Sequence, residues 1–223
     1  MKLHVLLTGA TGMIGRGVLL ECLRSDEVES VLSIGRKPSG ESHPKLKELM
    51  ISDFKELSGK EEMLRGYNAC FFCLGASSFG ISEEEYSRVT YTMTKDFADA
   101  LAAVNREITF IYISATGADS SEKGRIFWAR EKGKTENMLF AKGFTGAYMF
   151  RPGFIEPLDG IVSRTPLYRW LYILIAPFTP LLRKLMPDKI TDTRRIGRAM
   201  IGIARKGFGK TLLENNDINE AAL

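Results

Sequence analysis

The stretch LHVLLTGATGMIG, residues 3–15, decides the fold of this chain. A run of strand-forming residues leads into three glycines spaced as Gly-x-x-Gly-x-x-Gly, and a helical pattern follows. Gly9 permits the tight turn, Gly12 lets the backbone approach a pyrophosphate, and Gly15 lets the helix pack close to the strand. Free N–H groups and the dipole at the start of the helix favour bound phosphate. The stretch therefore predicts a dinucleotide-binding βα unit.

Short apolar runs alternate with longer helical patterns along the rest of the chain. Strands are expected at residues 3–8, 30–34, 46–52, 68–74, 108–114, 147–151 and 211–213. This alternation is typical of βα units that stack into a parallel sheet, with right-handed crossovers that place helices on both faces. The sequence thus predicts an α/β fold of the Rossmann type, a doubly wound and mostly parallel sheet.

Two of the helices have clear starting points. The first begins at Ser82, where Glu85 completes a capping box. Its apolar stripe runs through Tyr86, Val89, Met93, Phe97, Leu101 and Val104. The second begins near Thr193, and the apolar residues on one of its faces are Ile196, Ala199, Met200 and Ile203.

Length and composition limit the classes of function. The chain has 223 residues, 44% of them apolar and 26% charged, with a net charge of +4. Because no repeat, low-complexity stretch or linker divides it, residues 1–223 are expected to form one NAD(P)-binding domain. The basic residues are scattered, which argues against a nucleic-acid partner. The apolar start is too short for a signal peptide, so we expect a cytoplasmic protein.

The three cysteines, Cys22, Cys70 and Cys73, are expected to be buried small hydrophobic residues. Cys70 and Cys73 have the spacing of a redox or metal pair, but in a strand an offset of three places the two thiols on opposite faces of the sheet. The histidines, His4 and His43, are far apart and in no ligand spacing. No metal site is therefore expected.

The most apolar segment begins at Leu167 and ends at Leu185. Its uncharged run, residues 170–182, is shorter than the roughly 18 residues of a membrane span and contains Pro177 and Pro180, so no span is expected. The helical spacing of its apolar residues favours core packing or a subunit interface that would make the protein a homo-oligomer. A lid over a substrate pocket and a membrane-surface helix are the alternatives.

The end of the second strand bears on the choice of cofactor. NAD-binding proteins normally carry an acidic residue here, which accepts a hydrogen bond from the ribose. This chain has Arg36 and Lys37 instead. A guanidinium can pair with a 2′-phosphate, so NADP(H) is favoured over NAD(H), although two cations in a solvated loop would look the same.

Further candidate contacts for the cofactor follow the third and fourth strands. Asp53 and Phe54 either meet the adenine amino group or form a surface turn. Leu74, Gly75 and Ala76 end the fourth strand, where small residues let a ribose lie against the backbone. The remaining candidates lie in the first turn, namely Gly9, Thr11, Gly12, Met13, Ile14 and Gly15.

These motifs, together with Ser114 after the fifth strand and Arg151 to Gly153 after the sixth, resemble an atypical short-chain dehydrogenase/reductase along nearly the whole chain. The chain is most similar to epimerase/dehydratase-like proteins and to the Tat-interacting oxidoreductase-like group. The resemblance implies NADP(H) in an extended cleft and a small C-terminal helical segment that covers the substrate. It also implies four residues at the nicotinamide end, Pro152, Gly153, Phe154 and Ile155.

The superfamily's catalytic pattern is a serine followed by Tyr-x-x-x-Lys, in which the phenol transfers a proton, the lysine lowers the phenol pKa and holds the ribose, and the serine orients the carbonyl. By this resemblance Ser114 and Lys132 are the candidate catalytic residues, and Lys132 is also a cofactor contact. Trp128 stands four residues before Lys132, and an indole cannot act as acid or base. Tyr91 precedes Lys95 by four, but it lies about 13 Å along an earlier helix, so we expect it to pack.

Two functions therefore stay open. The first is an NADPH-dependent oxidoreductase acting on an unidentified small carbonyl or hydroxyl compound, with the proton supplied by Ser114, Lys132, a water or the substrate itself. The second is a non-catalytic NADP(H)-binding redox sensor or regulatory protein, which keeps the phosphate cradle and lacks the acid. A structural partner-binding module would leave the glycines and Arg36 unexplained.

Overall fold

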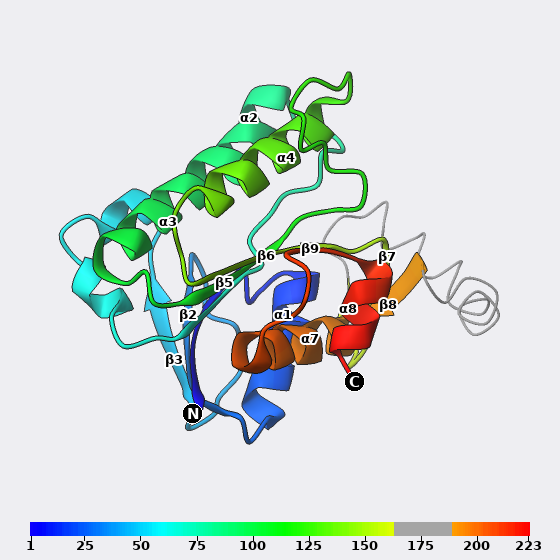
Figure 1. Ribbon diagram of the computed structural model, residues 1–223. Helices are drawn as coiled ribbons and strands as arrows, with labels where there is room; N and C mark the ends of the chain where they lie inside the picture. The colour runs from blue at the N-terminus through cyan, green and yellow to red at the C-terminus, as the bar shows by residue number, and fades with distance from the viewer. Residues whose placement is uncertain (163–188) are drawn as a thin grey trace.

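The computed structural model describes residues 1–162 and 189–223, which form an α/β fold around a seven-stranded sheet (Figure 1). In sheet order the strands are β3 (Leu46–Met50), β2 (Val28–Gly35), β1 (Leu3–Thr8), β4 (Ala69–Phe72), β5 (Thr109–Ile113), β6 (Gly146–Arg151) and β9 (Leu212–Glu214). Every neighbouring pair is parallel. This is the Rossmann order with one further strand, so the predicted fold class is confirmed.

Helices cover both faces of this sheet, and each face has its own apolar core (Figure 1). One face carries α1 (Met13–Arg24), α7 (Thr193–Lys206) and α8 (Asn215–Ala221). The other carries α2 (Glu83–Ser87), the π-helical turn η3 (Arg88–Thr92), α3 (Met93–Val104) and α4 (Phe127–Phe140), with the short 3-10 turns η1 (Phe54–Leu57) and η2 (Glu61–Leu64) beside them. Successive side chains of a strand point to opposite faces of the sheet, so Leu7 of β1 packs in the core beside α1 and Leu6 packs in the core beside α3.

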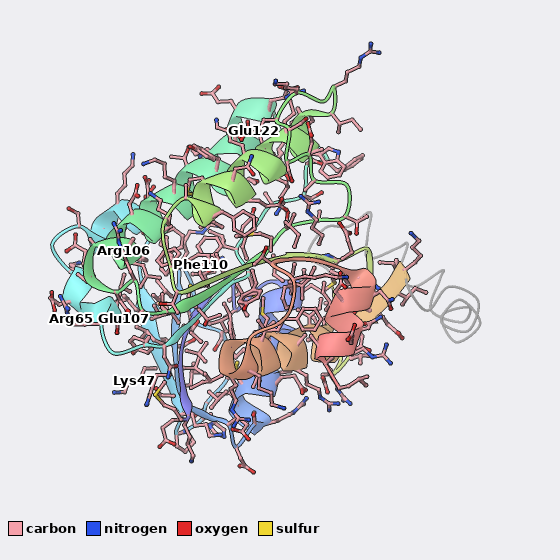
Figure 2. All side chains as sticks on the ribbon, in the orientation of Figure 1. Lys47, Arg65, Arg106, Glu107, Phe110 and Glu122 are labelled. Atoms are coloured by element: carbon pink, nitrogen blue, oxygen red, sulfur yellow. The ribbon has the colours of Figure 1, made fainter. Side chains whose placement is uncertain are left out.

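The same alternation separates the cysteines as expected. Cys70 lies in the core beneath α3, whereas Cys73 packs with Cys22 against the core on the α1 side. All three are free thiols, and burial raises the pKa of each. Figure 2 shows Phe110 of β5 on the α3 side of the sheet, where its ring centroid lies 6.4 Å from that of Phe97. We find no redox pair at this position.

The helix expected from Ser82 is present, but it is not continuous. Ser82 Oγ accepts a hydrogen bond from the backbone N–H of Glu85 at 3.1 Å, which is half of the expected capping box. The π-helical turn η3 then adds one residue to the helical register. The inward face after it therefore includes Thr90 and Thr94, both buried, while Val89 is only half-buried. The predicted stripe is wrong at this point because a 3.6-residue period cannot foresee an inserted residue.

After β6 the chain leaves the main sheet. The strand β7 (Phe154–Glu156) pairs in parallel with β8 (Ile190–Asp192), and α7 starts immediately after β8, where Asp192 caps it. Helix α7 crosses α1 closely, since a Cβ added at Gly17 would lie 2.5 Å from the Cβ of Thr193. None of the helices in the described ranges has both the length and the apolar composition of a membrane span. The segment 167–185 lies outside the described residues.

Candidate functional site

The glycine turn joins the end of β1 to the start of α1 and packs against the end of β4. Gly9 has φ = +73°, and a Cβ there would lie 2.7 Å from the carbonyl carbon of Cys73. A Cβ at Gly15 would lie 2.1 Å from the carbonyl oxygen of Gly9, so only glycine lets α1 approach this closely. The backbone N–H of Gly12 donates to Gly9 O at 2.8 Å and closes the turn. β1 and β4 are neighbours where the strand order reverses, which is where doubly wound sheets bind their ligands.

The N-terminus of α1 has the properties of an anion site. Gly12 caps the helix without a side-chain hydrogen bond, and the first turn contains no acidic residue. The N–H groups and the positive end of the helix dipole are therefore left for a ligand. A Cβ at Gly12 would meet only Gly9 O, at 3.2 Å, and Gly12 lines a cavity. This turn and helix fit the pyrophosphate of a dinucleotide.

A first cavity, of about 260 Å³, lies between the ends of β2 and β3 and is called the β2 cavity below. The predicted residues that line it are Gly9, Thr11, Arg36, Lys37, Asp53, Phe54 and Leu74. Arg36 and Lys37 are exposed, and neither forms an ion pair within residues 1–162 and 189–223. Asp53 Oδ1 accepts a hydrogen bond from Lys55 N–H at 3.0 Å and caps η1, so Asp53 forms a turn and also borders the cavity.

A second cavity, of about 630 Å³, continues from the first toward the end of β5 and is called the β5 cavity. The predicted residues that line it are Gly9, Thr11, Gly12, Met13, Ile14, Arg36, Leu74, Gly75, Ala76, Ser114 and Lys132. Trp128 and Tyr86 line it as well. The fold thus brings the phosphate cradle and the two candidate catalytic residues into one continuous site, since Arg36 and the glycine turn border both cavities.

Ser114 directly follows β5, and its backbone N–H donates to Phe150 O at 2.7 Å. The side chain is buried, yet its Oγ has no hydrogen-bond partner in the part of the chain that the structure describes. A buried hydroxyl without a partner is costly. Because Ser114 lines the β5 cavity, a ligand oxygen placed there would satisfy it.

Lys132 lies on α4 and is 7% exposed. Its Nζ donates to Tyr112 Oη at 3.0 Å and to Ile113 O at 2.9 Å. Burial lowers the pKa of Lys132 to about 8, and the carboxylate of Glu136, one turn further along α4, opposes that shift. Glu136 is itself fully buried and accepts a hydrogen bond from Arg151 Nε at 2.9 Å.

Two tyrosines of this site did not stand out in the sequence. Tyr112 shares a face of β5 with Ser114, because side chains two apart in a strand point the same way, and this alternation is the signal that could have identified it. Tyr86 sits in the first turns of α2 with its ring edge-on to Phe127, at 5.6 Å between centroids. Its pKa is raised by burial. Tyr86 was expected only to pack, but it lines the β5 cavity.

The four residues predicted at the nicotinamide end follow β6, and their contact with the cofactor stays a prediction. Within the described ranges, neither cavity is lined by Pro152, Gly153, Phe154 or Ile155. The carbonyl of Pro152 accepts from Thr116 N–H at 3.1 Å, and Gly153 N–H donates to Asn215 Oδ1 at 3.1 Å. These bonds fix the start of the segment that leads into β7.

Tyr91 and Lys95 have the Tyr-x-x-x-Lys spacing but pack on the surface of the helices, as expected. Lys95 Nζ pairs with Asp99 at 2.6 Å, and the Nζ of Lys134 lies 4.1 Å from the centroid of the Tyr91 ring. Neither residue lines the two cavities.

Among residues 1–162 and 189–223, no three His, Cys, Asp or Glu side chains lie close enough together to hold a metal ion.

Two proteins of known sequence are similar to part of this chain. Leucinostatins biosynthesis cluster protein T of Purpureocillium lilacinum is 27% identical over 141 residues, 62% of this chain and 51% of that protein. Protein FMP52, mitochondrial, of Debaryomyces hansenii is 25% identical over 151 residues, 66% of this chain and 64% of that protein. The chain thus spans between half and two thirds of the length of these relatives. The cytoplasmic location expected for this chain stays a prediction.

Solved structures share the fold at low sequence identity. A short chain dehydrogenase family protein from Francisella tularensis superimposes with a TM-score of 0.69 at 16% identity, covering 99% of this chain and 100% of that chain. A short chain dehydrogenase from Burkholderia cenocepacia in complex with NADP gives 0.70 at 13% identity, with 96% and 87% covered. The Bordetella bronchiseptica enzyme WbmH in complex with NAD+ gives 0.67 at 14% identity, with 95% and 74% covered.

The family model described as NAD dependent epimerase/dehydratase matches residues 5–126, which run from β1 across the glycine turn and β5. That match covers more than half of the chain. The strand order and the cradle at Gly9 and Gly15 agree with it. The chain belongs to the NAD dependent epimerase/dehydratase family.

Proposed function

We propose that the protein is an NADP(H)-dependent oxidoreductase that acts on a small carbonyl or hydroxyl compound and works without a phenol at position 128. One observation carries the proposal. The cavity bordered by the glycine turn and Arg36 continues to the unpartnered hydroxyl of Ser114 and to Lys132. A cradle for phosphate and a pair of polar groups for a carbonyl therefore share one site.

The chain's own residues have separable tasks in this proposal. The N–H groups at the start of α1 hold the pyrophosphate, and Lys132 holds the ribose next to the nicotinamide. Ser114 donates its free O–H to the carbonyl oxygen of the substrate. The bound nicotinamide supplies the hydride for reduction or accepts it for oxidation.

The preference for NADP(H) rests on the end of β2. Arg36 and Lys37 line the β2 cavity, and the carboxylate that would accept from a ribose hydroxyl is replaced there by the guanidinium of Arg36. Both cations are free of ion pairs with the described residues, so a 2′-phosphate would meet no competing carboxylate from them. The solved neighbours include one complex with NADP and others with NAD+.

Calorimetric titration with NADPH and NADH tests this preference. A charged hydrogen bond contributes about 1.5–3 kcal/mol, so Arg36→Ala should weaken NADPH binding at least about tenfold and leave NADH nearly unchanged. Arg65→Ala is the matched control, because Arg65 is exposed, lines neither cavity and is labelled at the left edge of the molecule in Figure 2. Equal losses for both dinucleotides in Arg36→Ala would contradict the assignment.

Trp128 favours a second candidate function, a redox sensor that binds NADP(H) without turning over a substrate. The indole lines the cavity beside Lys132, where the superfamily places its acid. A sensor must bind the reduced and the oxidised dinucleotide with different affinities, because only differential binding shifts a conformational equilibrium. Different affinities for NADPH and NADP+, together with no turnover of any carbonyl compound, would favour it.

A further inference from the structure

The β5 cavity has aromatic walls where the reaction would take place. Trp128 is half-buried on the first turn of α4, and its indole borders the same space as Ser114. Tyr86 borders it from α2, and Phe127 supports the Tyr86 ring edge-on. The facing residues from the loop after β4 are small, from Gly75 to Ser78. A flat ring can therefore enter beside the indole.

Exposed apolar side chains lie close in sequence to the lining residues. Phe79 directly follows the lining residue Ser78 and is 64% exposed, and Ile126 lies two residues before Trp128 and is 55% exposed. The only charged side chains that line the cavity, among the described residues, are Lys132 and Arg36, and no carboxylate does. The walls thus suit an uncharged aromatic ligand, and the single nearby charge at the reacting end is positive.

The chemistry of hydride addition narrows the class of ligand. A simple aldehyde or ketone becomes an alkoxide, a base at least as strong as hydroxide, because its conjugate acid is as weak an acid as water or weaker. It needs an acid beside it, and Trp128 cannot supply one. A quinone becomes a phenolate instead, whose conjugate acid has a pKa of about 10, as in tyrosine. A hydroxyl donor and a nearby cation are enough to stabilise such an anion.

We propose that the β5 cavity takes a quinone, stacked on the indole of Trp128 with one carbonyl oxygen at Ser114 Oγ. The inference deepens the proposed oxidoreductase function and rests on it. The quinone gains a hydride, two electrons and one hydrogen, from the reduced dinucleotide and becomes the hydroquinone monoanion. A proton from solvent then gives the hydroquinone. The dinucleotide is oxidised by two electrons, so the reaction consumes one quinone, one NADPH and one proton.

Ser114 and Lys132 stabilise the negative oxygen of that anion without being the source of its proton. The hydroxyl of Ser114 has a free donor, and Lys132, whose ammonium is held by Tyr112 and by the carbonyl of Ile113, lines the same cavity. Fixed donors aimed at developing charge are effective in a site that excludes water. At position 128 the chain then carries an indole that binds the quinone ring, in place of an acid.

Binding can be measured without dinucleotide and hence without turnover. Tetramethyl-1,4-benzoquinone is a suitable probe, because its blocked ring positions prevent addition of thiols. Calorimetry should show that Trp128→Leu weakens its binding about three- to tenfold, while Trp128→Phe keeps most of it. Phe140→Leu is the matched control, since Phe140 ends the same helix and lines neither cavity. An unchanged Kd in a folded Trp128→Leu variant would overturn the stacking.

Turnover separates this inference from the proposed function. With NADPH, the quinone should be reduced with a kcat/KM at least 100-fold above that of cyclohexane-1,4-dione, which has the same ring size and no aromatic product. Trp128→Tyr restores a phenol four residues before Lys132, so it should raise dione reduction and lower the quinone-to-dione ratio at least tenfold. Trp128→Phe should leave the ratio nearly unchanged.

Three outcomes would count against the inference in different ways. Equal kcat/KM for quinone and dione in the wild type, or a ratio that Trp128→Tyr does not lower, would overturn the quinone assignment and leave the oxidoreductase in place. NADPH binding without reduction of the quinone would overturn it and favour the sensor. Failure of NADPH to bind at all would contradict the proposed function itself.

Discussion

Lys132 Nζ donates a hydrogen bond to the phenol oxygen of Tyr112 at 3.0 Å and lies 4.7 Å from the centroid of its ring. A phenol and an ammonium are thus paired in this site, but the phenol comes from β5 and is completely buried. Burial raises the pKa of Tyr112 well above its usual value, so this phenol stays protonated. Its task is to hold the lysine in place, because Tyr112 lines neither the β2 cavity nor the β5 cavity.

The buried ammonium of Lys132 makes the stability of the protein depend on pH. Its pKa in the folded protein is about 8, below the value near 10.4 of an unfolded chain. Between these values this lysine binds more protons in the unfolded state, so its contribution to stability rises with pH from about 8 to 10.5, by no more than about 3 kcal/mol. The buried thiols and phenols have raised pKa values and oppose this rise equally in both proteins, so urea unfolding at pH 7 and pH 10 should show the wild type gaining stability relative to Lys132→Met.

Tyr112→Phe offers a check on the cause of this titration. It removes the oxygen that accepts from Lys132 Nζ, so the charged form of the lysine loses a partner and its pKa falls further. The rise in stability should then begin at a lower pH than in the wild type. A rise that starts at the same pH would show that Tyr112 does not control the lysine.

Two glycines of the first turn should respond differently to substitution. Gly12 has φ = −81° and an added Cβ there meets only Gly9 O at 3.2 Å, so Gly12→Val should fold but lose dinucleotide binding, because its methyl groups occupy the space of the pyrophosphate. Gly15→Val should unfold more readily, since its Cβ would lie 2.1 Å from Gly9 O. Thermal unfolding and NADPH titration measure the two effects, and undiminished NADPH binding by Gly12→Val would place the site elsewhere.

The buried ion pair between Arg151 and Glu136 should dominate the stability of the α4–β6 contact. Glu136 is fully buried, so Arg151→Met leaves an unpaired carboxylate and should cost about 3–5 kcal/mol in urea unfolding. The double variant Arg151→Met/Glu136→Leu should recover most of this loss. The exposed pair of Arg65 and Glu62 is the control, and Arg65→Met should cost less than about 1 kcal/mol. Similar losses at both pairs would refute the argument.

The fold and the phosphate cradle could be predicted because their determinants are local in sequence. Every strand of the main sheet was expected within a few residues, since apolar runs and turns mark strands wherever they finally pack. The spacing of Gly9, Gly12 and Gly15 likewise predicted a close strand–helix contact that the structure confirms. Opposite placement of Cys70 and Cys73 followed from strand alternation alone.

Contacts between distant segments were decided only by the tertiary structure. Tyr112 contacts Lys132 because α4 and β5 pack with these two residues opposite each other, and no local sequence pattern predicts that alignment. Tyr86 lines the β5 cavity. The extra residue of η3 also changes the helical register, so that Thr90 and Thr94 lie on the buried face. By itself, the sequence determined which segments become strands and helices and where phosphate can bind. Which side chains face one another across the β5 cavity depends on how those segments pack, because packing is set by the whole core rather than by neighbours along the chain.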